Sequence, residues 1–420
     1  MAAAEPVVTG RPVVARTAAL RRLRICYLVP GHGLLSTVGP SRNVLSLSRA
    51  LSAYADVTLA FRYRLEDRTP DGLELIELEP ERRPERAIDD AAMRGMGVAE
   101  FLRYMARLRR FVREAVGRFD VILEKSWLLS GHLSAYGLAR GVPGVPVENV
   151  VPSAARHVDA GLLKRLRVEV GRRLAGPALR RAPVVLAETE QLKTQIVDVW
   201  GVAPERVAVV PLGVDRELFR PRDQGEARRA LGFALDRTIL LYVGVLDETH
   251  TLDGIIEAVL TVRRPGLELH VVGDGPRRAA YAERASTSGG SVIIHGRVPH
   301  GAVPTWIAAA DLCLAPYEPR AFATGALGYA TMKVPEYLSV GRPVAGSPSP
   351  RMRELLRGGE LGFEVPADAA SWRAFLAELP DRERLAAMGR AALRHPQPSW
   401  DDTARGYLAA CERALASLGR

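Results

Sequence analysis

Cysteine and aromatic residues are scarce in this chain of 420 residues, which holds three cysteines and only 6% aromatic residues. Cys26, Cys313 and Cys411 lie far apart, so neither a disulfide framework nor a pair of metal-binding cysteines can be built from them. We expect the three to be small buried side chains in a reducing, cytoplasmic compartment.

Long apolar runs and several common motifs are also missing. No stretch approaches the roughly 20 apolar residues that a membrane-spanning helix needs. Residues 1–23 contain arginines but no uninterrupted apolar core, so we predict a disordered tail there and not a secretory signal. Asp-x-Asp, Gly-x-Ser-x-Gly and the Gly-Lys-Ser/Thr of nucleotide triphosphatases do not occur. Histidines, cysteines and carboxylates show no ligand spacing, so no bound metal is expected.

Positive charge is in excess and unevenly placed. Of a net charge of +10, the larger share falls in residues 1–215, with 32 Lys and Arg against 24 Asp and Glu. Arginines gather at 103–113, and basic residues at 156–181. Such a surface suits lipid phosphates or an acidic ligand, although an ordinary solvated surface explains it equally. Peripheral membrane contact through this basic N-terminal region therefore stays open. No nucleic-acid partner is expected, since no recognised binding module is present.

The order of apolar segments predicts two α/β domains, because 420 residues exceed what one core usually holds. Continuous apolar strands alternate with amphipathic helices, and the rhythm restarts at Thr238, which indicates two doubly wound parallel sheets. Pro211–Pro221, flanked by prolines, is the natural hinge. Helices beginning at 372, 382 and 400 finish the chain, and we expect no strand after Gly346. Two such domains would face a cleft at the carboxyl ends of their strands.

The most informative segment is Thr331–Gly346, which reads as a helix followed by a short buried strand. Lys333 and Glu336 lie three apart at the start of that helix and so share a face. Taken alone they could be a surface ion pair. At a sheet edge, however, the ammonium and the helix N-terminus favour an anion. The carboxylate can accept hydrogen bonds from ribose hydroxyls. Phosphate beside ribose indicates a nucleotide.

Two glycine-rich loops and one histidine are further candidates. The loop Gly31–Ser41 precedes a helix and could approach a phosphate or sugar closely. Gly273-Asp274-Gly275-Pro276 is only half of a dinucleotide fingerprint, so we interpret it as a tight turn. His250 lies in a loop before a helix and could donate to a phosphate oxygen, although a loop histidine is often only solvated.

Together these segments resemble the retaining glycosyltransferases of family 4, which have the GT-B fold. The resemblance runs from about Arg24 to Leu418. It is carried by LAETEQLKTQIVDVWGVAPERVAVVPLGVDRELFRP, LLYVGVLDETHTLDGIIEA, HGRVPHGAVPTWIAAADLCLAP and PSWDDTARGYLAACERAL. It implies an acceptor-binding domain at 24–213, a nucleotide-sugar-binding domain at 214–398, and a helix at 399–420 that crosses back to the first domain.

The resemblance also implies roles for particular residues. Glu336 would hold the ribose, and Lys333 and His250 the diphosphate, as catalytic residues. The remaining donor-binding candidates are Gly39, Gly244, Arg297, Val298, Gly328 and Thr331. Glu148 and Asn149 would lie on the acceptor side. The chain departs from many relatives by having Val245 where an arginine is common, His250 where a lysine is common, and Gly328 where a glutamate often contacts the donor sugar.

The resemblance implies a retaining, metal-independent transfer of a sugar from a nucleoside diphosphate sugar, with UDP or GDP expected, to an acceptor hydroxyl. We favour a small-molecule or natural-product acceptor. A lipid-linked or envelope glycan acceptor, a catalytically silent nucleotide-sugar-binding partner protein and a nucleotide-sugar epimerase are the alternatives.

Overall fold

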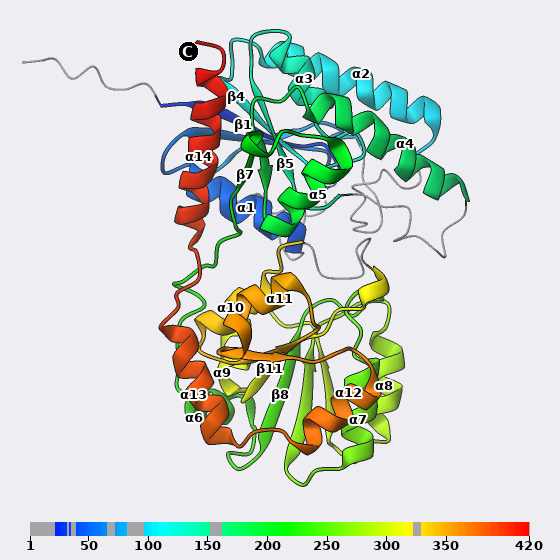
Figure 1. Ribbon diagram of the computed structural model, residues 1–420, viewed down its shortest axis with the longest axis vertical. Coiled ribbons are helices and arrows are strands. Elements are labelled where there is room, and N and C mark those ends of the chain that lie inside the picture. Colours follow the sequence, from blue (N-terminus) through cyan, green and yellow to red (C-terminus); the bar gives the residue numbers. More distant parts are fainter. Residues whose placement is uncertain are drawn as a thin grey trace, which may run out of the picture.

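The computed structural model describes residues 22–31, 33–34, 39–64, 72–81, 96–151, 162–321 and 329–419. They form two α/β domains, one above the other in Figure 1. The tail predicted at 1–23 falls outside these residues except for its end. There, Arg22 donates hydrogen bonds to the carbonyl oxygens of Ser52 and Ala55. Among the described helices, none is long and apolar enough to cross a membrane.

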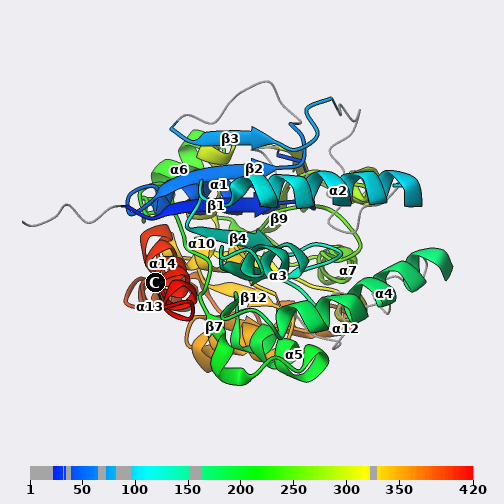
Figure 2. The same ribbon diagram turned by 90° about the horizontal axis from the view of Figure 1, so that it is seen from above.

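The first domain is built on a parallel sheet with the strand order β3-β2-β1-β4-β5-β6-β7. Figure 2 shows β3, β2, β1 and β4 side by side in that order. Its strands are β1 (Arg24–Val29), β2 (Asp56–Phe61), β3 (Glu74–Glu77), β4 (Val121–Lys125), β5 (Gly144–Glu148), β6 (Val185–Ala187) and β7 (Val207–Val209). Its helices are α1 (Gly39–Leu51), α2 (Val98–Ala115), α3 (His132–Leu138), α4 (Leu162–Leu179) and α5 (Glu190–Trp200).

The second domain has a parallel sheet with the order β10-β9-β8-β11-β12-β13. Its strands are β8 (Thr238–Val243), β9 (Leu267–Val272), β10 (Val292–Gly296), β11 (Leu312–Ala315), β12 (Val344–Gly346) and β13 (Gly362–Glu364). Its helices are α6 (Gln224–Leu231), α7 (Asp253–Val262), α8 (Arg278–Ser286), α9 (Val303–Ala309), α10 (Lys333–Ser339), α11 (Pro350–Leu355), α12 (Ala369–Ala377) and α13 (Arg382–Leu393).

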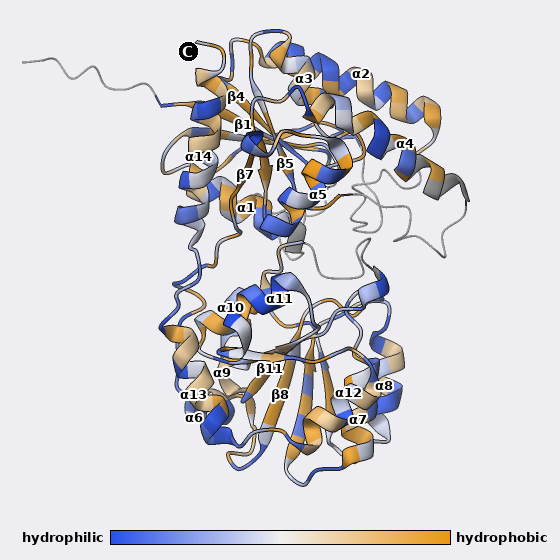
Figure 3. Ribbon diagram, viewed as in Figure 1, coloured by the Kyte–Doolittle hydropathy of each residue, from blue (hydrophilic) through white to orange (hydrophobic). Residues whose placement is uncertain are grey.

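Most strands are buried on both faces of their sheet, which is why they are largely apolar (Figure 3). In β1, Tyr27 packs with α1 on one face, whereas Leu28 packs with α2 and α3 on the other. In β8, Leu241 packs with α9 and α10, and Leu240 packs with α7 and α12. Successive side chains of a strand point to opposite faces, so each strand contributes to two cores. The predicted pair of Rossmann-like domains is thus confirmed.

The last helix, α14 (Trp400–Ala416), returns to the first domain and packs beside α1 (Figure 1). Ser399 and Asp402 close its N-terminus with a reciprocal capping box. Its apolar side, including Tyr407 and Cys411, is buried against the first sheet. This confirms the predicted crossover helix. All three cysteines are buried and unpaired, as expected.

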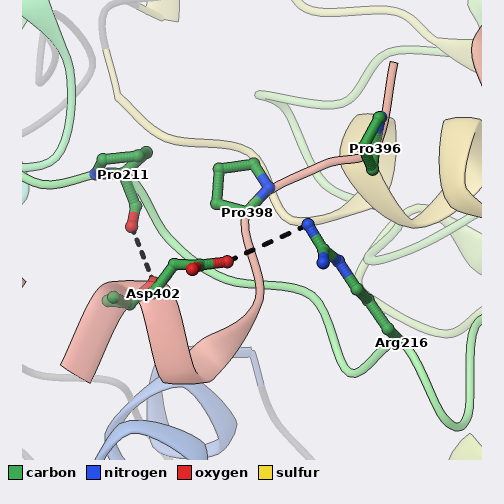
Figure 4. Close-up of a pocket in the computed structure, with 6 residues that line it drawn as sticks. Pro211, Arg216, Pro396, Pro398 and Asp402 are labelled. Atoms are coloured by element: carbon green, nitrogen blue, oxygen red, sulfur yellow. Dashed lines mark hydrogen bonds and ion pairs between the residues drawn. The ribbon is translucent and has the colours of Figure 1, made fainter. Parts of the chain in front are cut away.

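Two chain segments join the domains and lie side by side. The backbone amide of Val214 donates to the carbonyl oxygen of Pro398 at 2.8 Å. Gly213 is needed there, because a Cβ at this position would lie 2.4 Å from the Trp400 backbone nitrogen. The linker and the return segment border an open pocket of about 320 Å³ (Figure 4). It is lined by Pro211, Arg216, Pro396, Pro398, Asp402 and Thr403.

One expectation about the sheets was wrong. No strand was predicted after Gly346, yet β13 (Gly362–Glu364) pairs with β12 at the edge of the second sheet. The strand has three residues, too few to show a periodic apolar pattern. Gly362 allows the close pairing, because a Cβ there would lie 2.0 Å from the Val344 carbonyl oxygen.

Candidate functional site

Lys333 begins helix α10 and lies against two aromatic rings. Its Nζ is 4.4 Å from the centre of the Tyr242 ring and 5.4 Å from that of Tyr317, and it donates to the Tyr242 hydroxyl at 3.2 Å. Burial lowers the pKa of Lys333 to about 7, although Asp247 and Glu336 oppose this shift. Ring faces attract a cation but do not neutralise it. Among the residues that the structure describes, the lysine forms no ion pair, so its ammonium form is suited to an anionic ligand.

The Tyr242 and Tyr317 rings are themselves fixed by hydrogen bonds. Tyr242 donates from its hydroxyl to the Val245 carbonyl oxygen at 2.6 Å. The hydroxyl of Tyr317 donates to Thr331 Oγ1 at 2.6 Å. Thr331, predicted as a donor-binding residue, is thus buried and used to hold Tyr317. The tyrosines were not predicted as part of the site, since a tyrosine within or just after an apolar strand reads as core.

His250 lies in the loop after β8, and its ring orientation is set by Asp247. Its Nδ1 is 2.8 Å from Asp247 Oδ1, which also accepts from the backbone amides of Thr249 and His250. On the other side, His250 Nε2 is 3.4 Å from the Tyr329 hydroxyl. Burial and the charge of Lys333 lower the pKa of His250, against the effect of Asp247. The structure therefore brings His250 and Lys333, two predicted diphosphate-binding residues, close enough to interact electrostatically.

Gly244 lets this group form. A Cβ at Gly244 would lie 2.9 Å from Lys333 Nζ and 2.8 Å from the Tyr242 hydroxyl. The loop is also approached from the neighbouring turn, where a Cβ at Gly273 would lie 1.8 Å from the Gly244 carbonyl oxygen. Gly275 has a φ of 156° and similarly approaches Leu246. The interpretation of Gly273–Pro276 as a tight turn therefore fits the packing.

Glu336 stands one turn after Lys333 and contacts the first domain. Arg42 of α1 donates from Nη2 to Glu336 Oε1 at 3.5 Å, and the same nitrogen is 2.5 Å from His300 Nε2. The Glu336 side chain is 13% exposed and that of Arg42 24% exposed. Burial raises the pKa of Glu336 to about 7, against the charges of Arg42 and Lys333. Neither Arg42 nor His300 was predicted from the sequence.

The segment after β10 leads into the His300 region. Arg297 is exposed, whereas Val298 is partly buried and packs on the core of the second domain. His300 follows and lies 5.4 Å from the Phe219 ring. Burial and the nearby Arg42 lower the pKa of His300 to about 4, so its ring is neutral. The predicted base-binding segment thus adjoins the residues that contact Glu336.

Gly328 and Gly39 are the remaining candidates for donor binding. Gly328 lies outside the described residues, as do parts of the loop Gly31–Ser41. Gly39 is the first residue of α1, the helix that carries Arg42. Among the residues that the structure describes, no group of three His, Cys, Asp or Glu is arranged to hold a metal ion.

Glu148 and Asn149 lie at the carboxyl end of β5 in the first domain. Glu148 is 1% exposed, and burial raises its pKa to about 8. Its Oε1 has no hydrogen-bond partner in the described part of the chain. Asn149 accepts a hydrogen bond from the Ser126 hydroxyl. Nearby, the Lys125 ammonium is 3.8 Å from Glu188 Oε1. The carboxyl edge of this sheet is therefore polar, although buried.

Comparison with known proteins decides the family. Residues 38–218 match the family model described as Glycosyltransferase Family 4, and residues 237–381 match that described as Glycosyl transferases group 1. The D-inositol 3-phosphate glycosyltransferase of Thermobispora bispora is 30% identical over 322 residues, which cover 72% of this chain and 73% of that protein. That of Geodermatophilus obscurus is 31% identical over 340 residues, 75% and 72% of the two chains. The chain is a family 4 glycosyltransferase.

Solved structures show that this glycosyltransferase has the GT-B fold. Sucrose-phosphate synthase from Thermosynechococcus elongatus aligns with a TM-score of 0.70 at 20% identity, covering 94% of this chain and 100% of that one. HepE from Anabaena, solved with UDP and glucose, aligns with a TM-score of 0.66 at 16% identity, covering 93% and 99%. The predicted fold, family and enzyme class are confirmed.

Proposed function

We propose that this glycosyltransferase moves a sugar from a nucleoside diphosphate sugar to an acceptor hydroxyl, with the donor held by the second domain. The observation that carries the proposal is the position of Lys333 and Glu336 on one turn of α10, the first beside His250 and the second beside the 297–300 segment. A diphosphate at Lys333 and His250 and a ribose at Glu336 would place the base near that segment. The solved HepE structure with UDP supports the donor class.

Side chains would stabilise the negative charge of the leaving diphosphate. As the bond between the sugar C1 and the phosphate oxygen breaks, negative charge grows on the diphosphate. The Lys333 ammonium would stabilise that charge, and His250 Nε2 would donate once the ring is protonated. The anionic diphosphate would itself raise both pKa values. Two side-chain cations at this place support a metal-independent transfer. Helix α10 has only seven residues, so its dipole would add little.

The family resemblance supports retention of the anomeric configuration. The acceptor oxygen would bond to C1 on the face that the phosphate leaves, and the acceptor proton would pass to the leaving phosphate oxygen. No side-chain base is then required. In this proposal Lys333 and His250 would donate hydrogen bonds to the diphosphate, and Glu336 would accept them from the ribose.

For the acceptor we propose a small polyhydroxylated molecule. The relatives named above act, by their names, on a cyclitol phosphate. In this chain Glu148 and Asn149 end β5 at the carboxyl edge of the first sheet, where ligands of open α/β sheets bind. Carboxyl and amide groups can pair with hydroxyls.

A thermal-shift screen with UDP, GDP, dTDP and ADP, followed by product analysis with the matching nucleotide sugar, tests the proposal. Inositol, inositol phosphates and polyphenols would form the acceptor panel. Stabilisation by one nucleotide and transfer to a panel member are expected. Release of a free epimerised sugar without any acceptor, or nucleotide binding with neither transfer nor hydrolysis, would contradict it.

A further inference from the structure

Arg42 is a residue of the first domain that contacts two separate elements of the second. It lies in the first turn of α1, and its Nη2 is 2.5 Å from His300 Nε2 and 3.5 Å from Glu336 Oε1. His300 follows β10, whereas Glu336 is on α10. Arg42 therefore bridges the base-side segment and the residue expected to hold the ribose, from across the domain boundary.

Arg42 is the hydrogen-bond donor in both of its contacts. Arginine carries only donors, so the neutral His300 ring must accept at Nε2. The short contact to His300 anchors the guanidinium, and the longer contact reaches one oxygen of Glu336. A carboxylate offers about four acceptor positions on its two oxygens. Glu336 can thus keep Arg42 on Oε1 and still accept a ribose hydroxyl at Oε2.

Three charged groups act on Glu336, and a fourth titratable group, His300, contacts its partner Arg42. Arg42 of α1 and Lys333 of α10 favour its ionised form, Asp215 of the linker opposes it, and His300 is neutral. Of the two cations, Lys333 lies on the tyrosine rings, whereas Arg42 contacts the carboxylate directly. Within the described part of the chain, loss of Arg42 would remove the one hydrogen bond that the Glu336 carboxylate accepts.

We propose that Arg42 is a positioning residue of the donor site, which holds the Glu336 carboxylate ionised and oriented for the ribose from the opposite domain. The inference rests on the proposed function, since it assumes that Glu336 binds ribose. The alternative is that Arg42 only pairs with the Glu336 carboxylate and competes with the donor for it.

The experiment compares Arg42→Ala, Arg42→Lys and Glu336→Ala with the wild type, and uses Arg49→Ala as control. Arg49 is an exposed arginine in the last turn of the same helix. Calorimetry measures the Kd of whichever of UDP, GDP and ADP binds the wild type most tightly, and of its 2′-deoxy analogue. The ratio of the two Kd values reports the ribose contact.

Arg42→Ala should raise the Kd of the ribonucleotide about tenfold and bring the ratio toward one, as Glu336→Ala does. Arg42→Lys should recover part of the affinity, and Arg49→Ala should behave as the wild type. The loss in Arg42→Ala should be larger at pH 6 than at pH 8.5, because the carboxyl then protonates more readily.

Several results would overturn the inference. Unchanged or tighter nucleotide binding by Arg42→Ala would show that Arg42 only competes with the donor for Glu336. An equal loss of affinity for the ribo- and deoxynucleotide would show that Arg42 does not act through the ribose. If Glu336→Ala lowers affinity and Arg42→Ala does not, only this inference fails. If the wild type binds none of the nucleotides, the proposed function fails with it.

Discussion

The ammonium of Lys333 lies 4.4 Å above the centre of the Tyr242 ring and donates to the hydroxyl of that same ring at 3.2 Å. A buried lysine is usually stabilised by a carboxylate. Here the nearest fixed partners are an aromatic face and a phenol, which attract the cation weakly. This arrangement keeps the ammonium in place and leaves its charge for a ligand.

Gly244→Ala should displace Lys333, because the added Cβ would lie 2.9 Å from Nζ and 2.8 Å from the Tyr242 hydroxyl. We expect the Kd for the nucleoside diphosphate to rise about tenfold or more, with folding retained by circular dichroism. Gly97→Ala is the matched control, since nothing lies within 4 Å of a Cβ there. Equal nucleotide affinity in Gly244→Ala and the wild type would show that the lysine position does not matter.

Asp247→Asn should lower kcat about tenfold. An asparagine oxygen can still accept hydrogen bonds from the Thr249 amide and from His250, but it carries no charge to favour the protonated ring of His250. Asp368→Asn, which changes the exposed cap of α12, serves as control. Steady-state kinetics with saturating donor would measure the effect. If both variants turn over at the wild-type rate, the histidine does not need its carboxylate.

The dependence of kcat/KM on pH should form a narrow bell centred near 7. Glu336, with its pKa raised to about 7, loses its negative charge as the pH falls below that value. Lys333, with its pKa lowered to about 7, loses its positive charge as the pH rises above it. Because kcat/KM reports the free enzyme, both limbs should appear. Glu336→Gln should lose the acidic limb. An acidic limb that persists in this variant would assign it to another group.

Lys333→Met should stabilise the fold while abolishing activity. The folded pKa of about 7 lies below the ordinary value of 10.5, so between these values the unfolded chain binds more protons and stability rises with pH. Methionine removes the free-energy cost of burying the charged lysine, and this cost is fully present near pH 7 and below. We expect a Tm increase of roughly 2–4 °C or more at pH 7 for a gain of about 1 kcal/mol or more. The increase should shrink toward pH 10. A Tm below that of the wild type at pH 7 would contradict the claim that the buried Lys333 destabilises the fold.

The residues on and near α10 could be predicted from the sequence because each is recognised by its close neighbours in the chain. Lys333 and Glu336 are three residues apart, and His250 lies in the loop that follows an easily recognised apolar strand. Arg42 could not be found in this way, since it lies 294 positions from Glu336 and meets it only across the domain boundary. In sequence it is one arginine among many on an amphipathic helix.

The tyrosines were missed for a different reason. Tyr242 belongs to β8 and Tyr317 follows β11, so each one looks like an ordinary core residue in its part of the chain. Their hydroxyls reveal the site only when the strands are in register. The short strand β13 was missed because three residues give no pattern. The two parallel sheets, by contrast, could be predicted because their longer strands are continuous apolar runs separated by helices.

The most direct test of the account is the nucleoside diphosphate affinity of Lys333→Ala and Glu336→Ala, measured by calorimetry beside the wild type. The account predicts that Lys333→Ala lowers the affinity for the nucleoside diphosphate but leaves the affinity for the nucleoside alone unchanged. Glu336→Ala should lower both affinities. Wild-type affinity for the diphosphate in the two variants would contradict the assignment of this turn of α10 to the donor.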